Sequence, residues 1–262
     1  MNRLEIAIAA AREAGAVLRR KLEQTRIVNT KGPRDLVTDA DLAAQTAILA
    51  RLSAADPEAA ILSEEGGAAP DLDGPVPTWV IDPLDGTGNY ARRLPVFGVC
   101  IALLIGGQPE LGVVLDPLRQ ELYYAERGHG AFLQIGRRRP QPLTVSAVAE
   151  MGQAVLGAGW PREDHLRGQA AALLPRLGYA CHSLRLLGSA ALTLAYIAAG
   201  RVDGCLHLNL QPWDVAAGAA LLREAGGQLS DLNGRPWQIH QRALIASNGR
   251  LHAELVRCLA AD

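Results

Sequence analysis

The chain has 262 residues, of which 49% are hydrophobic, and a formal net charge of −1 at pH 7. This length suffices for one large hydrophobic core or for two fused halves. The near-neutral charge gives no support for a nucleic-acid or anionic-membrane partner, and the longest apolar stretch, 96–105, is far shorter than the roughly 20 residues that cross a bilayer.

The first predicted element is an amphipathic helix near the N-terminus. Apolar residues recur every three or four positions from about residue 4 to residue 22, which marks one face of a helix. Charged side chains interrupt the same segment and exclude the apolar core of a signal peptide. A turn over 31–35 then leads to a second helix, expected from about Asp39 to Ala55.

The middle of the chain predicts strands joined by short turns. Strand-like runs lie at 60–62, 79–81, 96–105, 112–115, 121–125 and 131–135. Turns that contain Gly or Pro separate several of them, which predicts antiparallel hairpins. From about residue 150 strands alternate with helices, which are expected at 165–177, 189–199, 213–225 and 250–260. The first half is therefore predicted to be α+β and the second half α/β.

The segment 79–87 places two carboxylates at the end of a buried strand. The apolar run Trp79-Val80-Ile81 is followed by Asp82-Pro83-Leu84-Asp85-Gly86-Thr87. Proline fixes φ between the two acids, and glycine lets the backbone approach a bound group. Carboxylate oxygens beside a hydroxyl suit a magnesium-assisted phosphate site. A plain polar turn is the alternative, because Asp, Pro and Gly are common turn residues.

Three further segments carry acids that have both a structural and a functional explanation. Glu64 and its neighbour Glu65 follow an apolar run, as at a solvated strand terminus. Asp41 lies three residues after Thr38, a spacing that also fits a helix capping box. Asp214 lies in the first turn of a predicted helix, where the helix dipole favours an acid.

Taken in order, these segments resemble the inositol monophosphatase family of magnesium-dependent, lithium-sensitive phosphatases. The matching strings are Asp35-x-Val37-Thr38-x-x-Asp41, Glu64-Glu65, Asp82-Pro83-x-Asp85-Gly86-Thr87, Gly128-x-Gly130-Ala131-Phe132, Trp213-Asp214 and Glu224-Ala225-Gly226-Gly227. The resemblance extends from about residue 4 to residue 258. It implies a five-layer α-β-α-β-α sandwich. We expect an N-terminal α+β half, 1–145, with most metal ligands, and a C-terminal α/β half, 146–262.

The resemblance implies a site with two or three metal ions. Glu64, Asp82 and the backbone carbonyl of Leu84 would hold the first ion. Asp82 would bridge to a second ion, held also by Asp85 and Asp214. No histidine or cysteine lies in the four segments that carry these acids, so ligation by oxygen alone favours Mg²⁺, or Mn²⁺, over Zn²⁺.

The catalytic residues expected from the resemblance are Asp41, Glu64 and Thr87. Asp41 would orient the hydroxyl of Thr87, beside which a metal-bound water would attack the phosphate. Backbone N–H groups of Gly86 and Thr87 are expected to hold phosphate oxygens. Lys31 either adds a charge near the site or is a solvated loop lysine.

The ring of the substrate is expected to contact Gly188, Ser189 and Ala190, which look like the family's Gly-Ser/Thr-Ala element. Inositol-specific members place a glutamate seven residues before the Trp-Asp aspartate, where this chain has His207. A histidine can donate to a ring hydroxyl but does not reproduce a carboxylate that accepts two hydrogen bonds. A histidine with only a structural role in a strand is the alternative.

We therefore expect an enzyme that hydrolyses a small polyol or sugar phosphate such as inositol-1-phosphate. Histidinol phosphate and fructose-1,6-bisphosphate are alternative substrates within the family. A regulatory member that binds partners, with secondary catalysis, is a hypothesis of a different class. The complete set of acids and the lack of a basic tail argue against it.

The remaining features predict the cellular context. The four cysteines show no C-x-x-C spacing and are expected to be free, buried thiols in a reducing compartment. The run Arg137-Arg138-Arg139 precedes a proline between strand-like segments and is expected at a solvated hairpin tip. We expect a cytoplasmic homodimer that acts on a small phosphorylated metabolite, with no membrane or nucleic-acid partner.

Overall fold

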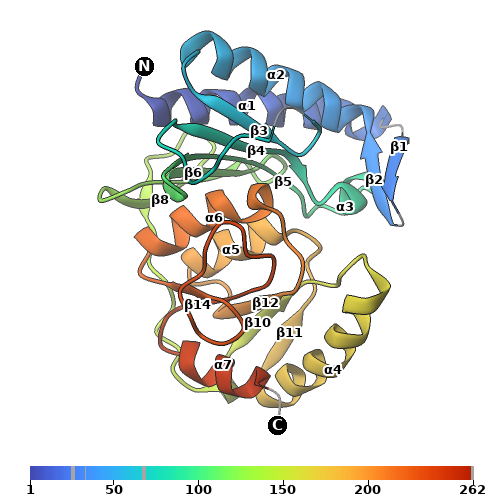
Figure 1. Ribbon diagram of the computed structural model, residues 1–262, viewed down its shortest axis with the longest axis vertical. Coiled ribbons are helices and arrows are strands. Elements are labelled where there is room, and N and C mark those ends of the chain that lie inside the picture. The colour runs from blue at the N-terminus through green and yellow to red at the C-terminus, as the bar shows by residue number, and fades with distance from the viewer. Residues whose placement is uncertain (25–26, 33, 67–68, 261–262) are drawn as a thin grey trace.

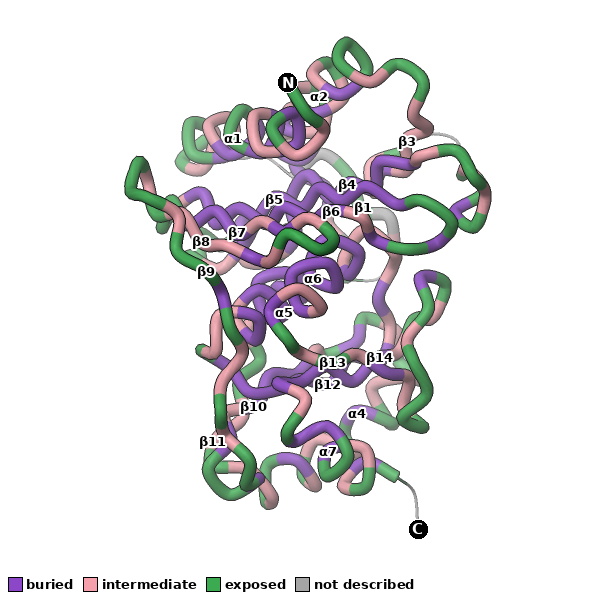
Figure 2. The backbone as a smooth tube through the Cα atoms, turned by 90° about the vertical axis from the view of Figure 1, so that its left-hand side faces the viewer, coloured by how far each residue is buried: buried purple, intermediate pink, exposed green. Residues whose placement is uncertain are grey.

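The computed structural model describes residues 1–24, 27–32, 34–66 and 69–260. Its helices and strands are stacked in five layers (Figure 1). A pair of long helices covers a seven-stranded sheet, two central helices follow, and a five-stranded sheet is covered by a last pair of helices. This arrangement confirms the five-layer sandwich that the sequence predicts. Buried residues concentrate in the two sheets and the central helices (Figure 2).

The first layer consists of α1 (Arg3–Lys21) and α2 (Asp39–Ala55), close to the two predicted helices. A capping box begins α1: the side chain of Asn2 accepts a hydrogen bond from the backbone N–H of Glu5 at 2.8 Å, and the Glu5 carboxylate accepts one from the N–H of Asn2 at 3.0 Å. Both helices bury their apolar faces in one cluster with the sheet below.

A β-hairpin connects these two helices where the sequence predicts only a turn. Strands β1 (Ile27–Gly32) and β2 (Asp35–Thr38) pair antiparallel as a separate two-stranded sheet. The turn expected over 31–35 is therefore the tip of a hairpin. Runs this short give too few alternating positions for a strand to be recognised from periodicity.

The second layer is the seven-stranded sheet, in the order β3-β4-β5-β6-β7-β8-β9. Its strands are β3 (Ala60–Ser63), β4 (Thr78–Asp85), β5 (Gly98–Ile105), β6 (Gln108–Asp116), β7 (Glu121–Glu126), β8 (Gly130–Ile135) and β9 (Gln141–Pro142). The pair β3 and β4 is parallel, and every later pair is antiparallel. The expected hairpins are confirmed.

Strand β4 is longer than the sequence predicts and contains the acidic segment. Asp82 pairs with Cys100 and Asp85 with Gly98, so two residues lie between the acids while only one lies between their partners. The segment is a bulge inside the strand, which continues to Asp85, so the expectation that the strand ends at residue 81 is wrong. The extra residue bends the strand locally and redirects its side chains. The short helix α3 (Thr87–Ala91) follows.

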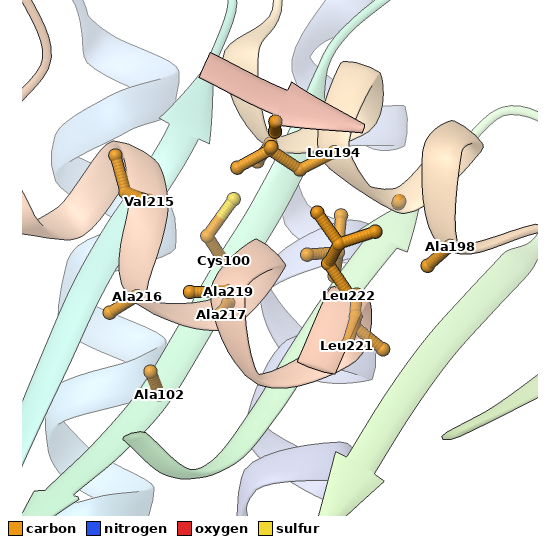
Figure 3. Packing of buried hydrophobic residues seen from close by; sticks show 14 of the residues in the cluster. Cys100, Ala102, Leu194, Ala198, Val215, Ala216, Ala217, Ala219, Leu221 and Leu222 are labelled. Carbon is orange, nitrogen blue, oxygen red and sulfur yellow. The ribbon is translucent and has the colours of Figure 1, made fainter. Parts of the chain in front are cut away.

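The third layer consists of α5 (Ala190–Ala198) and α6 (Pro212–Glu224), which lie between the two sheets. Most of their residues are buried, and alanine is frequent among them. Figure 3 shows Val215, Ala217 and Leu222 of α6 beside Leu194 of α5 and Cys100 of β5. Small side chains let these helices approach the sheet closely.

The fourth layer is the five-stranded sheet, in the order β11-β10-β12-β14-β13. Its strands are β10 (Val155–Ala158), β11 (Ser183–Arg185), β12 (Gly204–His207), β13 (Gln228–Ser230) and β14 (Leu244–Ser247). Strand β10 runs parallel to β11 and to β12. The carboxyl ends of these three strands therefore lie at one edge of the sheet, where α/β proteins bind ligands.

The fifth layer consists of α4 (Asp164–Ala180) and α7 (His252–Leu259). All four cysteines are free, but Cys181 and Cys258 are only partly buried. The expectation of buried thiols is wrong for these two, because they lie in the outermost layer, which solvent covers on one side. None of the described helices is both long and apolar enough to span a membrane.

We expect Gly112→Ala to lower the free energy of unfolding by about 1–3 kcal/mol, the usual cost of overpacking a core. A methyl group on Gly112 of β6 would lie 2.9 Å from the Cα of Ala217 and from the Cβ of Ala220 in α6. Gly168→Ala in α4 is the control, since no atom lies within 4 Å of the added methyl, and should raise stability by about 0.5–1 kcal/mol. Denaturant unfolding measures both, and equal effects would contradict the close packing of α6 on β6.

Candidate functional site

A pocket of about 550 Å³ opens where the end of β4 meets the carboxyl ends of β10, β11 and β12. Its lining brings together acids that lie far apart in the sequence, namely Glu64, Asp85 and Asp214. Thr87 and His207 line the same pocket. The loops after both sheets thus contribute to one cavity.

The acidic cluster consists of two aspartates of the pocket lining, Asp85 and Asp214, and the neighbouring Asp82. Carboxylate oxygens of Asp82, Asp85 and Asp214 lie within 4.8 Å of one another. Asp82 is 1% exposed and Asp85 is 7% exposed, while Asp214 is partly buried. Glu64 is close enough to act electrostatically on all three.

Burial and mutual repulsion make this cluster electrostatically unfavourable on its own. Burial, followed by the charges of Glu64 and the other acids, raises the pKa of Asp82 well above its usual range. Burial raises the pKa of Asp85 to about 6 and, with the charge of Asp85, that of Asp214 to about 8. A bound cation would stabilise the ionised form of these carboxylates, which burial and their mutual repulsion disfavour.

Backbone N–H groups hold each carboxylate in place. The N–H of Leu84 donates to Asp82 Oδ1 at 2.9 Å within the bulge of β4. Asp85 Oδ2 accepts from the N–H of Ala191 at 3.0 Å at the start of α5, and also from the hydroxyl of Ser189. Asp214 Oδ2 accepts from the N–H of Gln211 at 2.7 Å at the start of α6. Two helix N-termini, which favour negative charge, therefore position two of the acids.

Asp41 both caps a helix and contacts the site. Its Oδ2 accepts one hydrogen bond from the N–H of Thr38 at 2.9 Å and another from the Thr38 hydroxyl. Thr38 is the N-cap residue of α2, so these bonds belong to the cap of that helix. Its Oδ1 lies 3.1 Å from Thr87 Oγ1, and Thr87 Oγ1 lies 3.0 Å from the carbonyl oxygen of Leu84. Asp41 therefore takes part in the capping box and also contacts Thr87, and its catalytic role stays a prediction.

Two glycines and an asparagine shape the wall around Thr87. Gly86 has φ of 91°, and a Cβ there would lie 3.0 Å from the carbonyl oxygen of Val96, so that no other residue fits without strain. Gly188 has φ of 74° and packs against Asn89. Asn89 Nδ2 donates to the carbonyls of Val96 and Leu187, at 2.7 and 2.8 Å.

His207 lies at the end of β12, 5% exposed, and burial lowers its pKa to about 4, so the ring is neutral at pH 7. Its Nε2 is shielded from solvent and has no hydrogen-bond partner among the described residues. Gly159 leaves room for the ring, because a Cβ there would lie 3.1 Å from His207 Cε1. Ala190 also lines the pocket, together with Gly188 and Ser189.

A set of polar and aromatic residues that line the pocket was not predicted from the sequence. They are Arg34, Asn89, Trp160, Arg162, Glu163 and Asn209. Most of them follow β10 or β12. Ligands bind at the carboxyl ends of parallel strands, so the position of these residues after two such strands could have identified them. The side chain of Lys31 lies outside the part of the chain that the structure describes, and its role stays a prediction.

Comparison with known proteins gives one consistent result. The model of the inositol monophosphatase family matches residues 2–261. The protein named Nus factor SuhB from Escherichia coli K12 is 41% identical over 251 residues, which cover 95% of this chain and 92% of that protein.

Solved structures agree. An inositol monophosphatase from Anabaena matches with a TM-score of 0.85 and 38% identity, covering 98% of this chain and 94% of that one. The extragenic suppressor protein suhB from Bartonella henselae matches with a TM-score of 0.89 and 36% identity, covering 97% of each chain.

We expect Asp82→Asn to stabilise the metal-free protein at pH 7, because it removes a buried acid whose pKa burial and the neighbouring acids raise well above its usual range. The wild-type protein should gain stability when Mg²⁺ replaces a chelator, as any ligand of the native state gives, and the variant should gain much less. Thermal unfolding with EDTA and with Mg²⁺ measures both effects. Glu254→Gln, an exposed change on α7, should respond like the wild type; a full Mg²⁺ response in Asp82→Asn would contradict the assignment.

Proposed function

The chain belongs to the inositol monophosphatase family, and from this premise we propose that it is a divalent-metal-dependent phosphomonoesterase. Its substrate would be a small polyol or sugar phosphate, such as inositol-1-phosphate. One observation carries the proposal: Asp82, Asp85 and Asp214 converge within 4.8 Å beside a hydroxyl that Asp41 can orient. Buried acids with strongly raised pKa values are concentrated at functional sites.

The donor set fits hard cations. Carboxylate oxygens of Glu64, Asp82, Asp85 and Asp214, with the carbonyl of Leu84, are ligands that Mg²⁺ and Mn²⁺ prefer. We propose that Glu64, Asp82 and Leu84 hold a first ion and that Asp82, Asp85 and Asp214 hold a second. The proposed number of ions is two or three. When bound, such ions activate water and stabilise the leaving oxygen.

The protein's own groups would position the attack. Thr87 carries one hydroxyl proton, and donating it to Asp41 Oδ1 leaves the lone pairs of the Leu84 carbonyl for a cation. The hydroxyl oxygen of Thr87 can then accept a proton from the attacking water. Burial raises the pKa of Asp41 above its ordinary value, which favours its action as the proton acceptor behind Thr87. The N–H groups of Gly86 and Thr87 are proposed to hold phosphate oxygens.

The polyol would lie toward Gly188, Ala190 and His207, which line the pocket beyond the acids. Ser189 is proposed to act differently, since its hydroxyl already donates to Asp85 and accepts from the N–H of Leu192. The main role of Ser189 would then be to position the carboxylate of Asp85. We also propose two halves, 1–145 and 146–262, in a cytoplasmic homodimer.

Phosphate release tests the proposal directly. The wild-type protein should hydrolyse at least one of inositol-1-phosphate, histidinol phosphate, fructose-1,6-bisphosphate and 3′-phosphoadenosine 5′-phosphate with Mg²⁺, and none with EDTA. Asp82→Asn should lower the rate by at least about 10³-fold, as expected for loss of a principal electrostatic group. A variant that keeps a tenth of the activity at saturating Mg²⁺ would overturn the proposed metal site.

Thr87→Ala should lower kcat by about 10²-fold or more with little change in KM, because its hydroxyl would act on the water in the transition state. Thr87→Ser, which keeps the hydroxyl, is the matched control and should retain most of the activity. Steady-state kinetics on the best substrate of the panel measures this. An equal rise of KM in Thr87→Ala would show instead that Thr87 only binds the substrate.

The Escherichia coli relative is named Nus factor SuhB. This name favours a second candidate function for the present chain, that of a regulatory protein that works through partners. The expectation that nucleic acid is not a partner therefore stays a prediction. Expression of wild-type and Asp82→Asn protein in Escherichia coli that lacks its own relative separates the two candidates. If both proteins restore the function that this strain has lost, the result supports a regulatory role independent of catalysis. If only the wild-type protein restores it, the result supports the phosphatase.

A further inference from the structure

The side-chain amide of Gln45, in α2, spans the segment that carries Glu64. The hydroxyl of Ser63, one residue before Glu64, donates a hydrogen bond to Gln45 Oε1. Gln45 Nε2 in turn donates to the carbonyl oxygen of Glu65, one residue after Glu64, at 3.4 Å. The acceptor and the donor of one amide are therefore both used on the two neighbours of a single proposed metal ligand.

The place of Glu64 in the sheet explains why it needs such a support. Glu64 directly follows β3, which is an edge strand of the sheet and pairs only with β4. Its N–H donates to the carbonyl oxygen of Ile81 in β4 at 3.1 Å, and the other side of β3 is the edge of the described sheet. Backbone N–H groups fix the three aspartates of the cluster. The segment of Glu64 is instead fastened to α2 by a side chain.

Helix α2 thereby contacts two separate parts of the site. Gln45 lies four residues after Asp41, so both side chains leave the same face of the helix. Asp41 contacts Thr87 after the end of β4, and Gln45 contacts the end of β3. Glu64 also acts electrostatically on Asp41. One rigid helix thus relates the position of a proposed metal ligand to that of the proposed water-orienting hydroxyl.

We propose that Gln45 is a positioning residue, which holds the backbone on both sides of Glu64 so that its carboxylate faces the first of the proposed metal ions. This inference rests on the proposed function. Ser63 is 5% exposed, so the contact between its hydroxyl and the amide is shielded from competing water. Residues that hold metal ligands in place typically change metal affinity by about 10–100-fold when they are removed.

Gln45→Met tests the inference, because methionine has a similar size but can form neither hydrogen bond. We expect the dissociation constant for Mg²⁺, measured by calorimetric titration of the metal-free protein, to rise about 10-fold or more. Thr46→Ala is the matched control, since it removes a hydrogen bond of 2.8 Å to the carbonyl of Leu42 at the next position of α2. Its Mg²⁺ affinity should stay within about twofold of the wild type, as for other exposed changes away from a site.

Ser63→Ala is a second variant, which keeps the test valid if Gln45→Met folds poorly. It removes the same hydrogen bond and should therefore also weaken Mg²⁺ binding. The double variant should lose less binding free energy than the sum of the two single losses, because both act through one contact. A merely structural role would lower the melting temperature in EDTA and leave the Mg²⁺ affinity unchanged. Unchanged affinity in both single variants, or fully additive losses, would overturn the inference.

Phosphate release by the same proteins separates this inference from the proposed function. If the wild-type protein hydrolyses no ester of the panel but Gln45→Met still weakens Mg²⁺ binding, the proposed function fails and the inference stands. If the wild-type protein is active and Gln45→Met binds Mg²⁺ equally tightly, the inference alone fails. A wild-type protein that binds no Mg²⁺ would refute both.

Discussion

Repulsion between buried carboxylates is the constraint on which the rest of this structure depends. Three aspartates converge within 4.8 Å, and two of them are almost completely buried. Such an arrangement costs stability unless a cation is bound. The surrounding elements reduce that cost: a bulge in β4 presents one N–H to Asp82, and the first turns of α5 and α6 present theirs to Asp85 and Asp214. The site thus exists because three separate elements end or bend at one point.

The central helix layer makes that convergence possible. Helices α5 and α6 lie between the sheets, and their many alanines let both sheets approach. Close approach is greatest at Gly112, where the backbone of α6 takes the space of a side chain. The packing of the third layer therefore determines how near β4 lies to the carboxyl ends of β10 and β12. Loop residues such as Glu163 and Asn209 meet at the rim as a consequence.

Much of this could be predicted from local patterns. The helix over 39–55 and the antiparallel hairpins follow from periodicity and turn residues. The acids of the site could be identified from short sequence motifs. The bulge at Asp82 was not, because proline and glycine in that string are also typical of a turn. The pair Glu163–Asn209 could not be predicted, since 46 residues separate them and only the parallel pairing of β10 with β12 brings them together.

Crystals of the wild-type protein soaked in Mn²⁺ would test the central claim most directly, by anomalous scattering at the manganese edge. The account predicts at least one strong anomalous peak in contact with carboxylate oxygens of Asp82, Asp85 and Asp214. It also predicts that the peak disappears in crystals of Asp82→Asn. A map without a peak among these three residues, or an unchanged peak in the variant, would contradict the claim that the buried acids form a divalent-metal site.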